Sequence, residues 1–316
     1  MMKRLLLSLM VLGFAAYACA QPGGFGGGQL PESKADYKDV DYVGDGIEAH
    51  RLDIYLPHGK EAKSKVIVVI YGSAWFSNNM KSMSFFSLGK PLLDAGFAVV
   101  CINHRSSGEA KFPAQINDVK AALRFVRAHA EQYGFDTSFV GITGFSSGGH
   151  LASLAGVTNG MQTRTVGSTT IDIEGRLGVN LDQPSTVDAV VDWFGPVDMA
   201  RMENCSTVKD AQSPEAALIG GAPADNSDMV ALISPITYVT PEGPRFLVVH
   251  GEADTVVPHC QGEYFSEELR KAGRLEAFIS VPDGQHGPVT FNEQTFKCMT
   301  DFFVKEATAK LKDSRE

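Results

Sequence analysis

Residues 139–155 read FVGITGFSSGGHLASLA, a strand-like run followed by a helix-like one. Its first five residues predict a short strand, and the residues from Ser147 onward predict the start of a helix. Between them lies Gly144-Phe-Ser146-Ser-Gly148, which matches the pattern G-x-S-x-G. A sharp strand-to-helix turn leaves no room for large neighbours, so the two glycines predict that Ser146 is raised on such a turn.

This position makes Ser146 the candidate nucleophile. At a helix N-terminus, backbone N–H groups and the helix dipole favour the negative charge that develops when a hydroxyl attacks an acyl carbon. The alternative is a Gly/Ser-rich turn that only caps a helix. In that case Ser147 is the cap and Ser146 is incidental.

Apolar runs and helical patterns alternate on both sides of this turn. The run KVIVVIY at 65–71 is apolar after its first residue, as expected of a strand buried on both faces. Strands that alternate with helices form parallel sheets, so the pattern predicts an α/β fold with a mostly parallel central sheet. Polar segments at 157–187 and 199–235 predict loops and short helical fragments that shape a substrate cleft. Further strands are expected at 47–55, 97–103, 189–194, 244–250 and 275–281, and helices at 114–133 and 293–312.

A loop of small residues follows the apolar strand and reads YGSAW at 71–75. A serine nucleophile needs amide donors for the oxyanion. In proteins with this kind of turn, the amide donors belong to the residue after the nucleophile and to a loop that follows an earlier strand. We therefore expect the N–H groups of Ser73, Ala74 and Ser147 to be the donors, the alternative being a plain tight turn. Two interpretations of Trp75 stay open: it lines the acyl pocket, or it packs in the core.

A loop after a late strand supplies the candidate acid. Residues 246–258 read FLVVHGEADTVVP and place Asp254 directly after a predicted strand. An acid there accepts the N–H of an imidazole, fixes its tautomer and stabilises the imidazolium. Asp198, after the strand at 189–194, is the alternative acid, and Glu252 is expected to face solvent.

The candidate base follows the last predicted strand. Residues 280–288 read SVPDGQHGP, a run of turn-forming residues around His286. Imidazole has an unperturbed pKa of about 6.5, which suits proton transfer at neutral pH. The alternative is an exposed loop histidine without a function. His104, His150 and His250 are expected to be structural.

These loops resemble those of known esterases. Residues 71–75 are similar to the HGGGW loop of hormone-sensitive-lipase-like carboxylesterases, and 250–258 are similar to the HG-x-x-D-x-x-VP signature of α/β-hydrolases. Longer segments at 103–154 and 192–239 resemble the acetyl-xylan and feruloyl esterases of polysaccharide-degrading bacteria. The resemblance covers most of the chain, from about Asp53 to Phe303.

The resemblance implies the α/β-hydrolase fold, with helices on both faces of the sheet and inserted loops over the cleft. It implies a secreted serine carboxylic-ester hydrolase that works through an acyl-enzyme, without a metal or organic cofactor, on acetyl or feruloyl esters of xylan. Tyr71, Ser73 and Ala74 depart from HGGGW, which leaves the acyl preference open. Two alternatives are a prolyl-oligopeptidase-like serine peptidase and a non-catalytic hydrolase-fold binding module.

The N-terminal residues predict export to the periplasm or the exterior. A basic pair at 3–4 precedes an apolar stretch at 5–16, which is too short to span a bilayer, and Ala-Cys-Ala at 18–20 is a cleavage pattern. Lipid anchoring at Cys19 is the alternative, and it exports the protein as well. The expected parts of the chain are a signal peptide at 1–20, a Gly-rich tether at 21–36 and a catalytic domain at 37–316.

Charge and cysteine content limit the partners. The formal net charge is −9 and Lys and Arg form no basic stripe, which argues against nucleic acid and leaves a small-molecule or glycan ester as the expected partner. The sequence does not indicate an oligomeric state.

After cleavage of the signal peptide, three full disulfide pairings are possible among Cys101, Cys205, Cys260 and Cys298. Cys101 is expected to be a free buried thiol and Cys260 a structural residue, and no Cys/His spacing indicates a metal site.

Overall fold

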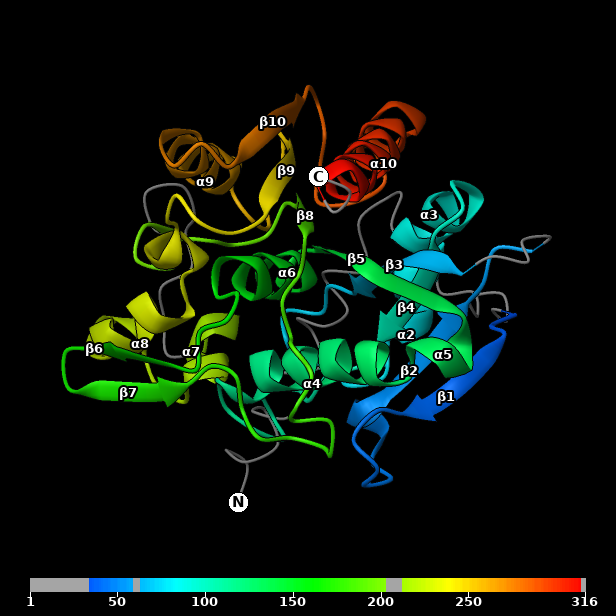
Figure 1. Cartoon of the computed structure of the whole chain (residues 1–316). Helices are drawn as coiled ribbons and strands as arrows, with labels where there is room; N and C mark the ends of the chain where they lie inside the picture. The colour runs from blue at the N-terminus through cyan, green and yellow to red at the C-terminus, as the bar shows by residue number, and fades with distance from the viewer. Residues whose placement is uncertain (1–33, 59–62, 203–211, 314–316) are drawn as a thin grey trace, which may run out of the picture.

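The computed structural model of the chain describes residues 34–58, 63–202 and 212–313 (Figure 1). The expected signal peptide with Cys19, most of the expected tether and Cys205 lie outside the described residues. Within them, an eight-stranded sheet has the order β1-β2-β4-β3-β5-β8-β9-β10. The strands are β1 (Tyr37–Asp41), β2 (Arg51–Tyr55), β3 (Ser64–Ile70), β4 (Ala98–Ile102), β5 (Phe135–Phe145), β8 (Ala189–Trp193), β9 (Arg245–Gly251) and β10 (Leu275–Val281).

Most neighbouring strands of this sheet are parallel. β2 pairs antiparallel with β1 and β4, whereas every neighbouring pair from β4 to β10 is parallel. The α/β fold with a mostly parallel central sheet, expected from the sequence, is confirmed.

Helices cover both faces of the sheet, as β3 illustrates. Val66, Val68 and Ile70 belong to one apolar core, and Ile67 and Val69 belong to a second. Successive strand side chains point to opposite faces, so a continuous apolar run is what a strand covered on both sides requires. The first core contains residues of α4 (Ala114–Ala128), α6 (Ser147–Val157) and α9 (Cys260–Lys271), and the second contains residues of α3 (Lys90–Asp94) and α10 (Glu293–Asp313).

The parallel strands direct their following loops to one place. β3 ends at Ile70, β5 at Phe145, β9 at Gly251 and β10 at Val281. The carboxyl ends of parallel strands meet at the same edge of a sheet, which is where ligands bind in open α/β folds. The loops that carry Ala74, the nucleophile candidate, the acid candidate and the base candidate therefore start side by side.

The expectation of loops at 157–187 is partly wrong. This segment contains a hairpin of β6 (Thr163–Val166) and β7 (Thr169–Asp172), which pair antiparallel as a separate sheet. Gly167 has a φ of +54° at the tip of the hairpin. Each strand contains two threonines together with Val166 or Ile171, and this β-branched composition favours strand structure in what reads as a polar loop.

Several element boundaries differ from the expected ones. The strand expected at 47–55 begins only at Arg51, after a short 3₁₀ helix, and β5 is longer than the five residues predicted. The helix expected at 114–133 divides at His129, whose ring stacks on Phe125, and continues as α5 (Ala130–Tyr133). Short helices at 199–235 are confirmed by α7 (Pro214–Ile219) and α8 (Ser227–Ile233), whereas α2 (Lys81–Ser84), α3 and α9 were not predicted.

The states of Cys101 and Cys260 agree with the expectation from the sequence. Cys101 is a free, buried thiol, Cys298 is a free, half-buried thiol, and Cys260 is disulfide-bonded. No group of three His, Cys, Asp or Glu side chains in the described ranges is arranged to hold a metal ion. Among the same residues, no helix is both long enough and apolar enough to cross a membrane.

Candidate active site

Ser146 lies on a strained turn between β5 and α6. Its φ is +56° and its ψ is −128°, a combination that costs roughly 1–3 kcal/mol in an L residue. The N–H of Ser146 donates to the carbonyl of Trp193 at 2.9 Å, and its own carbonyl accepts from His150 at 3.0 Å. Ser146 is the N-cap residue of α6, but its side chain makes no capping hydrogen bond. The hydroxyl is thus free for another partner.

Glycines around the serine allow this turn. A Cβ on Gly148 would lie 2.3 Å from the carbonyl oxygen of Ile70, and one on Gly144 would lie 2.3 Å from the carbonyl oxygen of Gly148. A Cβ on Gly72 would lie 2.6 Å from Cβ of Ser146. All three contacts are closer than real Cβ atoms allow. The glycines on either side of Ser146 are therefore required by close backbone packing, as the sequence predicted.

Ser146, His286 and Asp254 form a hydrogen-bonded chain. His286 Nε2 lies 2.9 Å from Ser146 Oγ, and His286 Nδ1 lies 2.8 Å from Asp254 Oδ2. The second carboxylate oxygen of Asp254 accepts the backbone N–H groups of Val256 and Val257 at 2.8 and 2.9 Å. Since the carboxylate accepts a hydrogen bond from the N–H at Nδ1, the lone pair is on Nε2, which can accept the hydrogen bond of the Ser146 hydroxyl.

The imidazole of His286 is held by an aromatic neighbour that the sequence analysis did not identify. The ring of Phe194 lies 4.7 Å from the ring of His286, centroid to centroid. Phe194 follows β8 directly and has a φ of +42°, and its N–H donates to the carbonyl of Val249 at 2.8 Å. The only sequence signal for this residue is its place at the carboxyl end of a predicted strand.

The three expected oxyanion donors are not equivalent. The N–H of Ser73 donates to Ser147 Oγ at 2.9 Å, so this amide is already occupied. The N–H groups of Ala74 and Ser147 have no acceptor among the described residues. Ala74 and Trp75 both have positive φ, at +50° and +60°, which turns the loop back at this point. In this structure the Ser73 amide therefore couples the loop to α6, and of the three expected donors only those of Ala74 and Ser147 have no partner in the described part of the chain.

Trp75 packs in the core. Its side chain is 1% exposed, its indole N–H donates to His150 Nδ1 at 3.2 Å, and the two rings meet edge to face at 5.1 Å. His150 Nε2 in turn donates to the carbonyl of Ile233 at 2.7 Å. Of the two interpretations of Trp75, the structure supports packing, and His150 is structural as expected.

The other candidates serve the scaffold. Asp198, the alternative acid, accepts from Arg201 Nε at 2.5 Å, and exposed Glu252 accepts from the hydroxyl of Ser280 at 2.7 Å. His250 is buried and donates from Nε2 to the carbonyl of Val257 at 2.9 Å, which holds the loop of the candidate acid. The structural role expected for this histidine is confirmed.

Buried His150 makes the stability of this region dependent on pH. Burial lowers its pKa from the ordinary value of 6.5 to about 4. Because the folded-state pKa is below the unfolded one, the neutral ring stabilises the fold fully above pH 6.5, and this contribution is lost as the pH falls toward 4. One pKa unit corresponds to about 1.4 kcal/mol, so the loss is roughly 3 kcal/mol.

We expect His150→Gln to be less stable than the wild type at pH 7.5, with the difference shrinking by roughly 2–3 kcal/mol by pH 4.5. Glutamine keeps a donor and an acceptor but does not titrate, and all other groups titrate alike in both proteins. Urea unfolding at the two pH values measures the change. A constant stability difference between the two proteins would contradict the prediction.

A family model described as BD-FAE matches residues 52–269 of this chain. Two solved structures are similar over most of the chain. A bifunctional GH43-CE of Bacteroides eggerthii is 65% identical with a TM-score of 0.85, covering 88% of this chain and 36% of that one. A truncated form of a carbohydrate esterase from gut microbiota is 55% identical with a TM-score of 0.86, covering 89% of this chain and 100% of that one.

Curated relatives are more distant in sequence. Esterase LipQ of Mycobacterium tuberculosis is 31% identical over 80% of this chain, and the probable carboxylic ester hydrolase LipM of the same organism is 30% identical over 78%. The chain spans 57% and 55% of the lengths of these two proteins.

Proposed function

The chain belongs to the BD-FAE family of α/β-hydrolase esterases, and from this premise we propose that it hydrolyses carboxylic esters through an acyl-enzyme on Ser146. The observation that carries the proposal is the chain of two short hydrogen bonds from Ser146 Oγ through His286 to the buried carboxylate of Asp254. Esterases among the relatives support the reaction class.

Acylation follows from this arrangement. Ser146 Oγ attacks the ester carbonyl carbon while its proton passes to His286 Nε2, and the carbonyl π electrons move onto oxygen. The negative charge of Asp254 stabilises the imidazolium that results. When the tetrahedral adduct collapses, the C–O bond to the alcohol breaks and His286 returns the proton to the leaving oxygen. Water then repeats the sequence on the acyl-enzyme and frees Ser146.

The oxyanion of the adduct is proposed to accept the N–H groups of Ala74 and Ser147. Ser147 opens α6, so its amide also carries the positive end of the helix dipole. One such donor typically contributes about 3–4 kcal/mol to transition-state stabilisation. Ser73 contributes indirectly, since its hydrogen bond to the Ser147 hydroxyl fixes the distance between the loop and the helix.

As substrate we propose acetyl or feruloyl esters of a plant polysaccharide such as xylan. The support is the similarity to two solved structures, both more than half identical, described as a carbohydrate esterase and a GH43-CE. Export belongs to the same proposal, because polysaccharide lies outside the cell, and it rests on residues 1–20. Mass analysis of the mature N-terminus distinguishes Gln21 from a lipidated Cys19.

A panel of acetylated xylan, methyl ferulate, p-nitrophenyl acetate and a peptide anilide tests the proposal. We expect release of acetate or ferulate and no cleavage of the anilide. Turnover of p-nitrophenyl acetate without release from either natural-type ester would overturn the substrate. Cleavage of the anilide as the best substrate would favour the peptidase alternative. Failure of a fluorophosphonate to label Ser146 in the folded protein would favour the binding module.

A further inference from the structure

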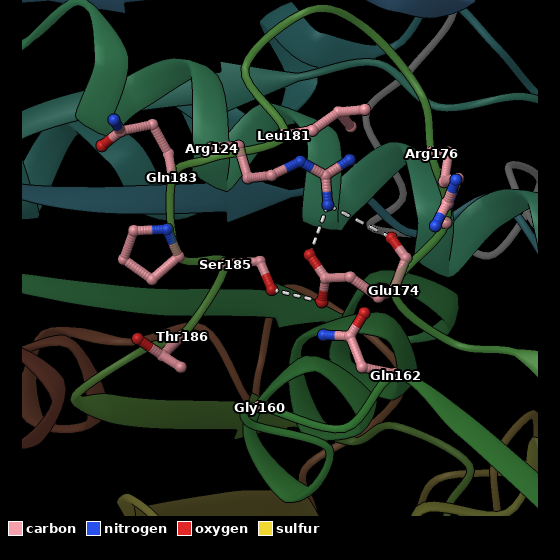
Figure 2. Close-up of a pocket in the computed structure, with 11 residues that line it drawn as sticks. Arg124, Gly160, Gln162, Glu174, Arg176, Leu181, Gln183, Ser185 and Thr186 are labelled. Carbon is pink, nitrogen blue, oxygen red and sulfur yellow. Dashed lines mark hydrogen bonds and ion pairs between the residues drawn. The ribbon is translucent and has the colours of Figure 1, made fainter.

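A pocket of about 460 Å³ lies away from Ser146, at the far end of α6. Figure 2 shows the residues that line it. Ser146 caps the N-terminus of this helix, whereas Gly160 and Gln162 of the pocket follow its C-terminus at Val157. An eleven-residue helix is about 16 Å long, so the two sites do not share a ligand group. The remaining wall comes from α4 and from the segment 174–186, which leads toward β8.

Two arginines of α4 hold the wall of the pocket in place. Buried Arg124 donates to the carbonyls of Glu174 and Leu177 at 3.2 and 3.1 Å and forms an ion pair with the Glu174 carboxylate. Arg127 donates to the carbonyls of Pro184 and Thr186 at 3.3 and 2.6 Å. The segment 174–186 is therefore fastened near both ends, and the pocket is formed before any ligand binds.

Some charged side chains of the pocket have partners in the described part of the protein and one does not. Both carboxylate oxygens of Glu174 have partners, one being Arg124 and the other the Ser185 hydroxyl at 2.7 Å, as Figure 2 shows. Arg176 is exposed and has no hydrogen-bond or ion-pair partner among the described residues. Of the charged residues that line the pocket, two are arginines and one is Glu174, in a chain whose net charge is −9.

The uncharged lining is polar on one part and apolar on another. The side chains of Gln162 and Thr186 have no hydrogen-bond partner within the described part of the chain, so an amide and a hydroxyl are available to a ligand. Leu181, 51% exposed, and Pro184 add apolar surface. A pyranose ring offers the complementary set, with hydroxyl groups at its edge and C–H groups on its faces.

We propose that this pocket binds a saccharide that carries a carboxylate, such as a uronic acid residue. The guanidinium of Arg176 pairs with the carboxylate, since Arg matches carboxylate geometry in a bidentate manner. Gln162 and Thr186 hydrogen-bond to ring hydroxyls, and Leu181 and Pro184 contact a ring face. The site would hold an acidic polysaccharide without taking part in ester hydrolysis.

The probe is a xylo-oligosaccharide bearing one glucuronic acid, with the unsubstituted oligosaccharide and sodium acetate as comparisons. Titration calorimetry on the full chain is expected to show binding of the acidic oligosaccharide at least tenfold tighter than of either comparison. Arg176→Gln is expected to weaken that binding about tenfold, and Leu181→Ser to weaken it as well. Arg270→Gln, which removes an exposed guanidinium from α9, is the matched control and should bind normally.

Hydrolysis of p-nitrophenyl acetate separates this site from the catalytic one. It should be unchanged in Arg176→Gln and Leu181→Ser, because neither residue is near Ser146. Equal binding of the acidic and unsubstituted oligosaccharides, or an unchanged affinity in Arg176→Gln, would overturn the carboxylate assignment. Acetate bound as tightly as the oligosaccharide would overturn the saccharide assignment. None of these outcomes bears on whether the chain is an esterase.

Discussion

Replacing Ser146 with alanine is expected to lower kcat/KM for p-nitrophenyl acetate by roughly 10⁶-fold, as for a serine that acts as one unit with its histidine. The variant has no hydroxyl to receive the acyl group, while the turn, the glycines and both free amides stay. Steady-state rates, with circular dichroism to confirm folding, measure the effect. Fluorophosphonate labelling should disappear in the same variant.

Ser147→Ala is the matched control, because it removes the adjacent hydroxyl and keeps the N–H at the start of α6. It breaks the hydrogen bond from Ser73 but leaves the nucleophile, so we expect a loss of about tenfold at most. If Ser147→Ala were the more damaging of the two, Ser147 would be the functional serine and Ser146 only a turn residue. Activity retained in Ser146→Ala would lead to the same conclusion.

Asp254→Asn is expected to lower kcat by roughly 10⁴-fold with little change in folding. The amide fits the same space but no longer fixes the proton on His286 Nδ1, and it lacks the charge that stabilises the imidazolium. The carboxylate is fully buried and accepts two backbone N–H groups, so water cannot replace it. Initial rates across a pH series measure how large the loss in kcat is and whether it persists at every pH.

Asp198→Asn is the comparison for this prediction. Asp198 was the alternative acid and bonds to Arg201, so its loss should leave kcat within a few-fold of the wild type. A large loss in Asp198→Asn with a small one in Asp254→Asn would reverse the assignment of the acid.

The residues brought together at the site were predictable because each is encoded by a short local pattern. Ser146, Asp254 and His286 each follow a recognisable strand, and parallel strands deliver their loops to one edge. What the sequence could not reveal depends on contacts between distant segments. The Ser73 amide donates to a hydroxyl 74 positions later, and the indole N–H of buried Trp75 donates to His150.

The same reasoning explains the errors in the fold. The hairpin at 163–172 has a polar composition, and its strand character depends on pairing across a turn at Gly167. The pocket near Arg124 was not foreseen for a similar reason, since two arginines one helical turn apart give no sign that they will bind carbonyls some 50–60 residues later. Arrangements of this kind carry no sequence motif.

The close backbone contacts at Gly72, Gly144 and Gly148 bear on how this protein can be re-engineered. A mutant library that randomises the turn should return glycine at these positions, whichever ester is used for selection, because any side chain there collides with main-chain atoms or with Ser146. New specificity has to come from elsewhere. Residues outside this turn carry no such constraint on the nucleophile, so substitutions there can change the preferred ester while the turn stays the same.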